Sequence, residues 1–189
     1  MSSHEKKHNA ESDYLSSGQL DDLPDTVKRE LNAHLAQYLK DPEGAHRWDP
    51  IVIGVPGGPV QTLLLTFIGR KSGKTLNTVL QYYQLGGQTA IVASKGGTVE
   101  HPSWYLNLLA NPECTVQIGK YNAPARARTV EGEERARWWD SITKEQPVQL
   151  QYQARTSRII PVVVLDFQSD LKPNSETAAN RPLRDTVRT

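Results

Sequence analysis

A helical spacing of hydrophobic residues marks the first ordered element of the chain. Val27, Leu31, Leu35 and Tyr38 recur three or four residues apart among polar neighbours. This period predicts an amphipathic helix over residues 25–40, ended by a turn at Asp41.

Further along, the pattern becomes that of β-strands. Strands are predicted over residues 62–68, 75–85, 89–94, 114–118, 122–130 and 159–167. Short turns join the first three, which therefore form an antiparallel meander. Tyr82 and Tyr83 are neighbours on one strand, so only one of them can point into the interior. Pro161 has no N–H to donate, and pairing at the start of the last strand should be incomplete.

Helical segments at residues 102–109 and 133–146 interrupt the strands. The economical arrangement is a mainly β fold with helices: a partly open antiparallel β-barrel of about six strands, with helices covering its gaps. We expect one barrel domain over residues 25–168. Residues 1–24 and 169–189 are polar and are predicted to be flexible tails.

Composition narrows the function classes. The net charge of the 189 residues is +1, which argues against a nucleic-acid partner, so a charged ligand would need a local cluster of cations. Cys114 is the only cysteine and is predicted to be a buried structural thiol. The N-terminal segment lacks the apolar stretch of a signal peptide, which predicts a cytoplasmic protein. The five histidines show no spacing typical of a metal site.

The turn at residues 69–74 is the first candidate binding segment. It resembles a phosphate-binding P-loop, but Ile68 stands where that motif needs a glycine, and a strand follows it in place of a helix. What remains is a turn with three cations, Arg70, Lys71 and Lys74, which could cradle a phosphate or a carboxylate. An ordinary polar hairpin turn is the alternative interpretation.

Two more segments carry candidate chemistry. The first is Ser94-Lys95-Gly96-Gly97, where glycines permit close approach of a ligand and the lysine adds a cation. A solvated loop would explain this segment equally well. The second is the helix at residues 102–109, in which Trp104 suits core packing. Asn107, a weak helix former, needs a reason to stand in mid-helix.

Together these segments resemble a known family. The order GRKSG, ASKGG, PSWYLNLLANP and RIIPVVVL, within residues 63–167, is similar to that of the deazaflavin-dependent nitroreductases, which include quinone and nitroimidazole reductases. The resemblance implies a split β-barrel fold of the FMN-binding type. It also implies coenzyme F420, an 8-hydroxy-5-deazaflavin with a phosphate and a polyglutamate tail. With the cationic cluster of the turn, it gives as cofactor-binding residues Arg70, Lys71, Lys74, Ser94, Lys95, Gly96, Gly97, Trp104 and Asn107.

The implied reaction is hydride transfer from the reduced coenzyme to a small-molecule acceptor: a quinone, an enone or an activated nitro compound. Ser94 and Tyr152 are the candidate catalytic residues that would orient or protonate the acceptor. Within residues 146–152 only Tyr152 remains of the several tyrosines that the nitroreductase member has there. This difference implies an acceptor other than a bicyclic nitroimidazole.

Two further differences from the family pattern leave alternatives open. Leu76 and Val79 stand where the family usually has an arginine and a proline. FMN, with one phosphate and no tail, is therefore an alternative cofactor, and a non-catalytic barrel that binds a lipid or another hydrophobic anion is an alternative function.

The partners of the helix over residues 25–40 also stay open. A quinone substrate would favour peripheral membrane contact, whereas the mixed charge of its polar face favours packing over the barrel or against a second subunit. Either a monomer or a homodimer fits the sequence.

Overall fold

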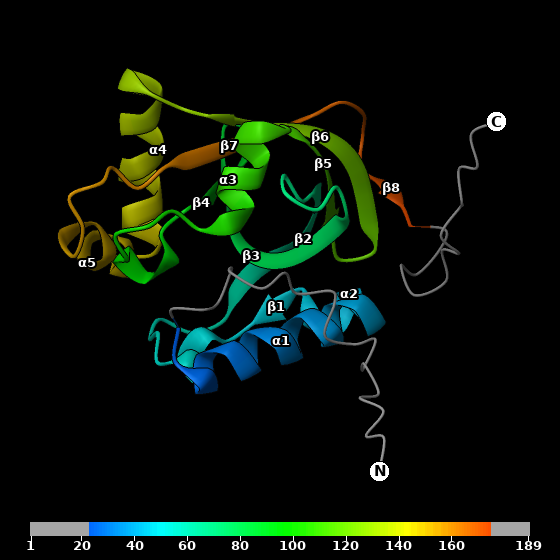
Figure 1. Cartoon of the computed structure of the whole chain (residues 1–189), viewed down its shortest axis with the longest axis horizontal. Coiled ribbons are helices and arrows are strands. Elements are labelled where there is room, and N and C mark those ends of the chain that lie inside the picture. The colour runs from blue at the N-terminus through cyan, green and yellow to red at the C-terminus, as the bar shows by residue number, and fades with distance from the viewer. Residues whose placement is uncertain (1–22, 175–189) are drawn as a thin grey trace, which may run out of the picture.

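The computed structural model describes residues 23–174, so most of the two predicted tails lies outside the described residues. Its strands are Val60–Ile68 (β2), Thr75–Leu85 (β3), Gln88–Val92 (β4), Glu113–Ile118 (β5), Tyr121–Thr129 (β6) and Val162–Phe167 (β7). They follow the order β2-β3-β4-β7-β6-β5, and β5 pairs again with β2, which closes an antiparallel ring (Figure 1). The predicted β-barrel is confirmed.

Two short strands extend this ring. Arg47–Trp48 (β1) pairs with β2, and Lys172–Pro173 (β8) pairs with β6, beyond the residue at which we expected the domain to end. Two single turns of 3₁₀ helix, Pro50–Ile53 (η2) and Lys95–Gly97 (η3), lie in the connections.

Alternation along the strands divides the apolar residues between two sides of the barrel wall. Leu63, Leu65 and Phe67 of β2 join the barrel core, whereas Leu64 packs outside it. The strand is thus buried on both faces, which explains its continuous apolar run. Tyr82 lies in the core and Tyr83 in a separate outer cluster, as the alternation predicts.

Helix Asp25–Lys40 (α1) covers one outer side of the barrel, and its predicted bounds are confirmed (Figure 1). Its Leu35 and Tyr38 pack against Leu64. The Tyr38 hydroxyl, fully buried, accepts a hydrogen bond from the Gly119 N–H at 3.0 Å. The apolar face of α1 therefore packs against the barrel. Among the described residues, no helix is long and apolar enough to cross a membrane.

The turn predicted after α1 is wrong in detail, because Pro42–Ala45 (α2) forms a further helical turn. Asp41 caps it by accepting a hydrogen bond from the Gly44 N–H at 3.0 Å, and Pro42 is pre-set for a first helical position.

Three helices surround the opposite half of the barrel. Ser103–Ala110 (α3) inserts Trp104, Tyr105 and Leu108 into the core at one end. Gly132–Glu145 (α4) packs Trp138 and Ile142 on the outer face of β7. Val148–Ala154 (α5) follows it, where sequence analysis assigned no element.

Two predicted strands are shorter in the structure. The strand expected over residues 89–94 ends at Val92, because the chain turns sharply at Ser94. The last strand starts at Val162, since Pro161 cannot donate to the ladder; its carbonyl still accepts from the Ala93 N–H at 2.9 Å.

Candidate functional site

The cationic turn at residues 69–74 is a hairpin that closes on itself. The Gly69 N–H donates to the Lys74 carbonyl and the Gly73 N–H to the Gly69 carbonyl, both at 2.8 Å. Gly73 has φ +67°, a conformation that favours glycine. The side chains of Arg70, Lys71 and Lys74 are exposed. The turn therefore presents three cations to solvent, and its strand–turn–strand context rules out a P-loop.

Asn107 of α3 fastens this turn to the barrel. Its side chain is only 4% exposed, and its Oδ1 accepts from the Arg70 backbone N–H at 3.1 Å and from Arg70 Nη1 at 2.9 Å. This pair of bonds is the reason for an asparagine in mid-helix. Trp104, one turn earlier, is 3% exposed and stacks edge-on against Tyr105 in the barrel core. It offers a ligand almost no surface and acts through packing.

The loop after β4 has an unusual backbone. Ser94 is in the right-handed helical region, and Lys95, Gly96 and Gly97 follow with φ +45°, +64° and +81°. Among the described residues, Lys95 is the only non-glycine with positive φ, at a cost of roughly 1–2 kcal/mol. A right-handed residue followed by a left-handed one turns successive N–H groups to one side and makes an anion-binding nest. Ser94 and Lys95 form such a nest.

The segment around α5 supports this loop. A Cβ on Gly97 would lie 2.4 Å from the Tyr152 carbonyl oxygen, so the loop touches the α5 backbone. Arg155 Nη1 donates to the Gly96 carbonyl at 3.3 Å, and Arg158 donates to three further carbonyls of the loop. Sequence analysis assigned neither arginine to the site, although Arg158 opens the RIIPVVVL segment on which the family resemblance partly rests.

The Tyr152 backbone thus lies against Gly97, in the loop that also holds Ser94. Tyr152 is half-buried, and burial raises the pKa of its hydroxyl although the Arg155 guanidinium opposes the shift. The hydroxyl therefore keeps its proton at neutral pH. Ser94 is half-buried too, and its carbonyl is bonded to Arg158 at 2.7 Å.

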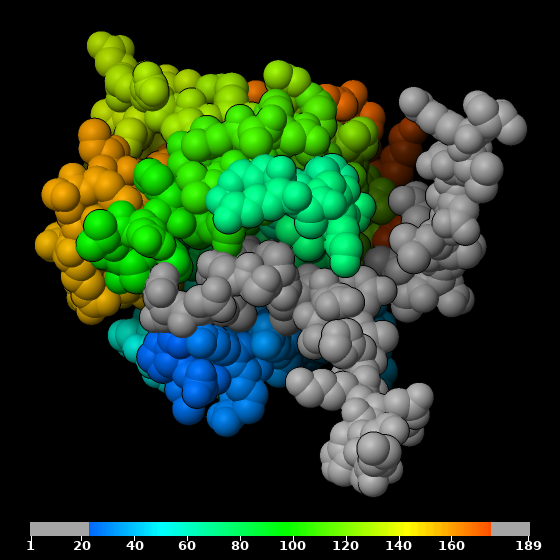
Figure 2. Space-filling model, viewed as in Figure 1, coloured from blue at the N-terminus to red at the C-terminus, as the bar shows by residue number. Residues whose placement is uncertain are grey.

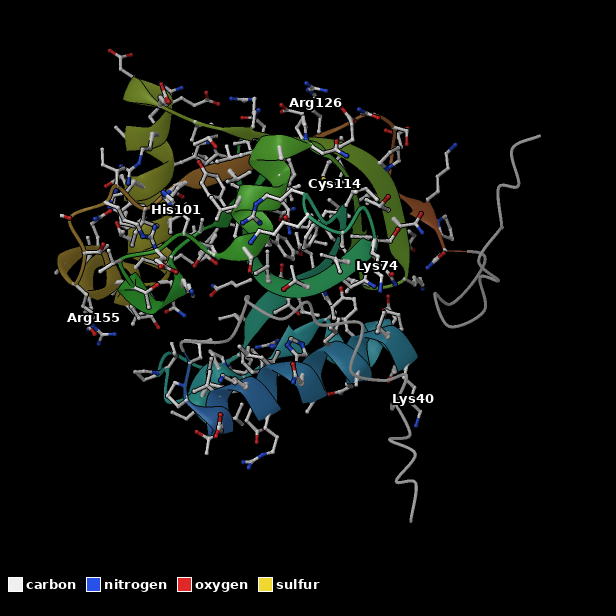
Figure 3. All side chains as sticks on the ribbon, in the orientation of Figure 1. Lys40, Lys74, His101, Cys114, Arg126 and Arg155 are labelled. Carbon is white, nitrogen blue, oxygen red and sulfur yellow. The ribbon has the colours of Figure 1, made fainter. Side chains whose placement is uncertain are left out.

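The predicted cofactor residues lie in the 69–74 turn, in the loop after β4 and on α3. The turn and α3 lie next to each other on the face seen in Figure 2. The loop after β4 lies on the same face, where it meets α5. Figure 3 shows Lys74 on the side of the turn and His101 and Arg155 on the side of α5. A nest of N–H groups and several exposed cations are donors suited to phosphate and carboxylate, so this face fits a polyanionic coenzyme.

Two hollows in the described surface lie elsewhere. One of about 330 Å³ is bounded by the 57–61 loop, β3 and the end of α4, with Tyr82 and Gln146 in its wall. One of about 140 Å³ lies between α3 and β6, beside Leu108 and Ala127. None of the predicted cofactor residues lines either of these two hollows.

Leu76, where the family usually has arginine, is 6% exposed and belongs to the barrel core. Val79 packs toward α1. Both residues serve packing, so the leucine is not by itself a sign of an FMN pocket.

Other candidate chemistry is absent from the described part of the chain. Cys114 is buried, and burial raises the pKa of its thiol to about 12, which makes it unreactive at neutral pH. Residues 23–174 contain no group of three or more side chains that could hold a metal ion.

Comparison with known proteins decides the family. The profile of the F420H(2)-dependent quinone reductases matches residues 28–166. The chain belongs to this family. An F420H(2)-dependent quinone reductase of Mycobacterium tuberculosis is 37% identical over 145 residues, which cover 74% of this chain and 97% of that protein. The chain is therefore an oxidoreductase, and its family uses coenzyme F420.

Solved structures agree with this assignment. An F420-H2 dependent reductase, FDR-A, has 43% identity and a TM-score of 0.52 over 56% of this chain and 93% of that one. A protein described as a domain-swapped dimer has 34% identity and a TM-score of 0.54 over 74% of this chain and 99% of that one.

Proposed function

We propose that this protein transfers a hydride from reduced coenzyme F420 to a quinone and binds the coenzyme along the α3 face of the barrel. The nest at Ser94 and Lys95 is the observation that carries the proposal. It offers backbone N–H groups to an anion, as the coenzyme phosphate requires. The exposed cations of the 69–74 turn, which Asn107 fastens to the middle of α3, would receive the carboxylates of the tail.

The two groups belong to different segments of the same face. One lies in the loop that precedes α3 in the chain, and the other lies in a turn held by Asn107 in the middle of that helix. A phosphate followed by a chain of carboxylates offers an anion to each group. Arg70 is held by Asn107 and is thus pre-oriented, while Lys71 and Lys74 remain free to follow the tail.

When bound, the reduced coenzyme supplies the hydride, and a quinone that accepts it needs one proton to become a hydroquinone. Tyr152 would hold that proton on its hydroxyl, because burial raises its pKa. The Ser94 hydroxyl would orient the acceptor oxygen. Ser94 belongs to the loop that carries the nest, and the Tyr152 backbone contacts Gly97 of the same loop, which supports placing both residues in one site.

Titration of the purified protein with oxidised coenzyme F420 tests the proposal. We expect Lys71→Ala to weaken binding about tenfold, the size of one lost charge-assisted contact. Lys40→Ala is the matched control, because it removes the same charge at the end of α1, away from α3 (Figure 3). Reduced coenzyme should be reoxidised by menadione, and Tyr152→Phe should lower kcat without weakening coenzyme binding. Equal affinities for both lysine variants, or no binding to the unsubstituted protein, would refute the proposed site.

A further inference from the structure

The side chain of Arg158 lies behind the loop after β4, on the side of its carbonyl groups. Nε donates to the Thr98 carbonyl at 2.9 Å, Nη1 to the Ala93 carbonyl at 3.1 Å and Nη2 to the Ser94 carbonyl at 2.7 Å. The guanidinium is half-buried and comes from a position 64 residues away from Ser94. One rigid, planar group thus holds three points of the loop at once.

These bonds fix the direction of the N–H groups in the nest. In a trans peptide the C=O and the following N–H point in opposite directions, and the described residues contain no cis peptide. The Ala93 and Ser94 carbonyls point at Arg158, so the N–H groups of Ser94 and Lys95 point away from it. Those are two of the N–H groups that make the nest.

We propose that Arg158 is a positioning residue that orients the Ser94 and Lys95 N–H groups for the coenzyme phosphate before the coenzyme binds. This inference rests on the proposed function. Arg158 acts through the loop backbone and does not touch the anion itself. Its effect is to remove the cost of ordering a loop with three successive left-handed residues at the moment of binding.

A lysine could not take over this role. It carries the same charge, but its ammonium is a single point on a flexible stem and cannot match three carbonyls in one plane. Arg155, which donates to Gly96 at 3.3 Å, is exposed and holds one carbonyl only. Of the two arginines, Arg158 therefore makes more bonds to the loop, in addition to the loop's own bond from the Gly97 N–H to the Ser94 carbonyl at 2.9 Å.

The test compares Arg158→Gln and Arg158→Lys with Arg128→Gln. Arg128 is a suitable control because it also makes several bonds, to Glu134 and Asp166, at the junction of β6, β7 and α4. Three quantities are measured on the full chain: the affinity for oxidised coenzyme F420, the Tm, and amide hydrogen exchange of residues 93–99 without coenzyme.

Both Arg158 variants should bind coenzyme at least about tenfold more weakly and should exchange the loop amides faster before coenzyme is added. Arg128→Gln should lower the Tm and leave coenzyme affinity and loop exchange unchanged. Arg158→Lys keeps the charge, so full recovery of affinity in that variant would overturn the positioning role. So would normal affinity and normal loop exchange in Arg158→Gln. Failure of the unsubstituted protein to bind coenzyme is a distinct result, which would overturn the proposed function and this inference with it.

Discussion

The two glycine-rich, cationic segments look alike in sequence but differ in how the rest of the barrel holds them. Both contain backbone hydrogen bonds of their own, such as that of the Gly97 N–H with the Ser94 carbonyl at 2.9 Å in the loop after β4. Asn107 holds the 69–74 turn through Arg70, and the cations of the turn face solvent. Arg158 holds three carbonyls of the loop, and the loop also contacts α5. The turn therefore supplies exposed charge, whereas the loop supplies backbone N–H groups with a fixed direction. Substitutions in the two segments should therefore have different effects on stability and on coenzyme binding.

The largest contrast is expected from one alanine placed in each segment. At Gly97 a Cβ would meet the Tyr152 carbonyl oxygen at 2.4 Å, in addition to the strain of φ +81°. At Gly73, with φ +67°, it would meet nothing within 4 Å. Urea denaturation should show a loss of about 3 kcal/mol for Gly97→Ala and about 1 kcal/mol for Gly73→Ala. Equal losses would mean that contact with α5 does not constrain the loop.

A smaller effect is expected where the turn is fastened to α3. Asn107→Ala removes the acceptor for both Arg70 bonds, which should cost about 1 kcal/mol because water can reach the exposed arginine. Coenzyme affinity should fall less than in Arg158→Gln, since the other cations of the turn stay in place. An affinity loss as large as that of Arg158→Gln would show that the turn also depends on tertiary support for its geometry.

The smallest effect is expected on the pH dependence of stability, through His101, which contacts Arg158 behind the loop after β4. Burial, together with the Arg158 guanidinium, lowers the pKa of His101, whose Nδ1 accepts from Arg158 at 3.3 Å. The unfolded chain therefore binds a proton more readily, so this contribution to stability is present above the ordinary pKa of 6.5 and is lost as pH falls below it. The ring of Tyr105 is the other neighbour of His101.

Replacing His101 by Asn should make the free energy of unfolding fall less steeply between pH 6.5 and 5, by under about 1 kcal/mol. Part of this dependence of unfolding free energy on pH should remain, because burial also lowers the pKa of His34 on the buried face of α1. If the free energy of unfolding of His101→Asn fell as steeply with pH as that of the unsubstituted protein, the contact of His101 with Arg158 would not contribute to the pH dependence.

Segments with a clear period were predictable from sequence. The bounds of α1 and β3 agree with the structure to the residue, because each has a long, regular pattern between strong turn signals. Helix α5 was not predicted, because its apolar residues Val148, Leu150 and Tyr152 alternate with glutamines, and this alternation is not a helical period. Its helical state depends on tertiary contacts such as that of Gln149 Nε2 with the Tyr83 hydroxyl at 3.2 Å.

The residues of the candidate site also differ in whether the sequence could predict them. The residue types that can bind an anion, from Arg70 to Gly97, were visible as local clusters of cations and glycines, and the family motif placed them in one site. The role of Asn107 toward Arg70 and that of Arg158 toward Ser94 were not visible, because 37 and 64 residues separate the partners.

The sequence by itself determined the strands of the barrel and the residues that can carry charge, because period, glycine and charge act over a few neighbouring positions. The cofactor class followed from the resemblance of its motifs to a known family. Only the tertiary structure decided which glycine-rich segment has its N–H groups turned to one side. The direction of a backbone N–H depends on what holds the opposite carbonyl, and here that group is the Arg158 guanidinium, which the segment between α5 and β7 brings to the loop.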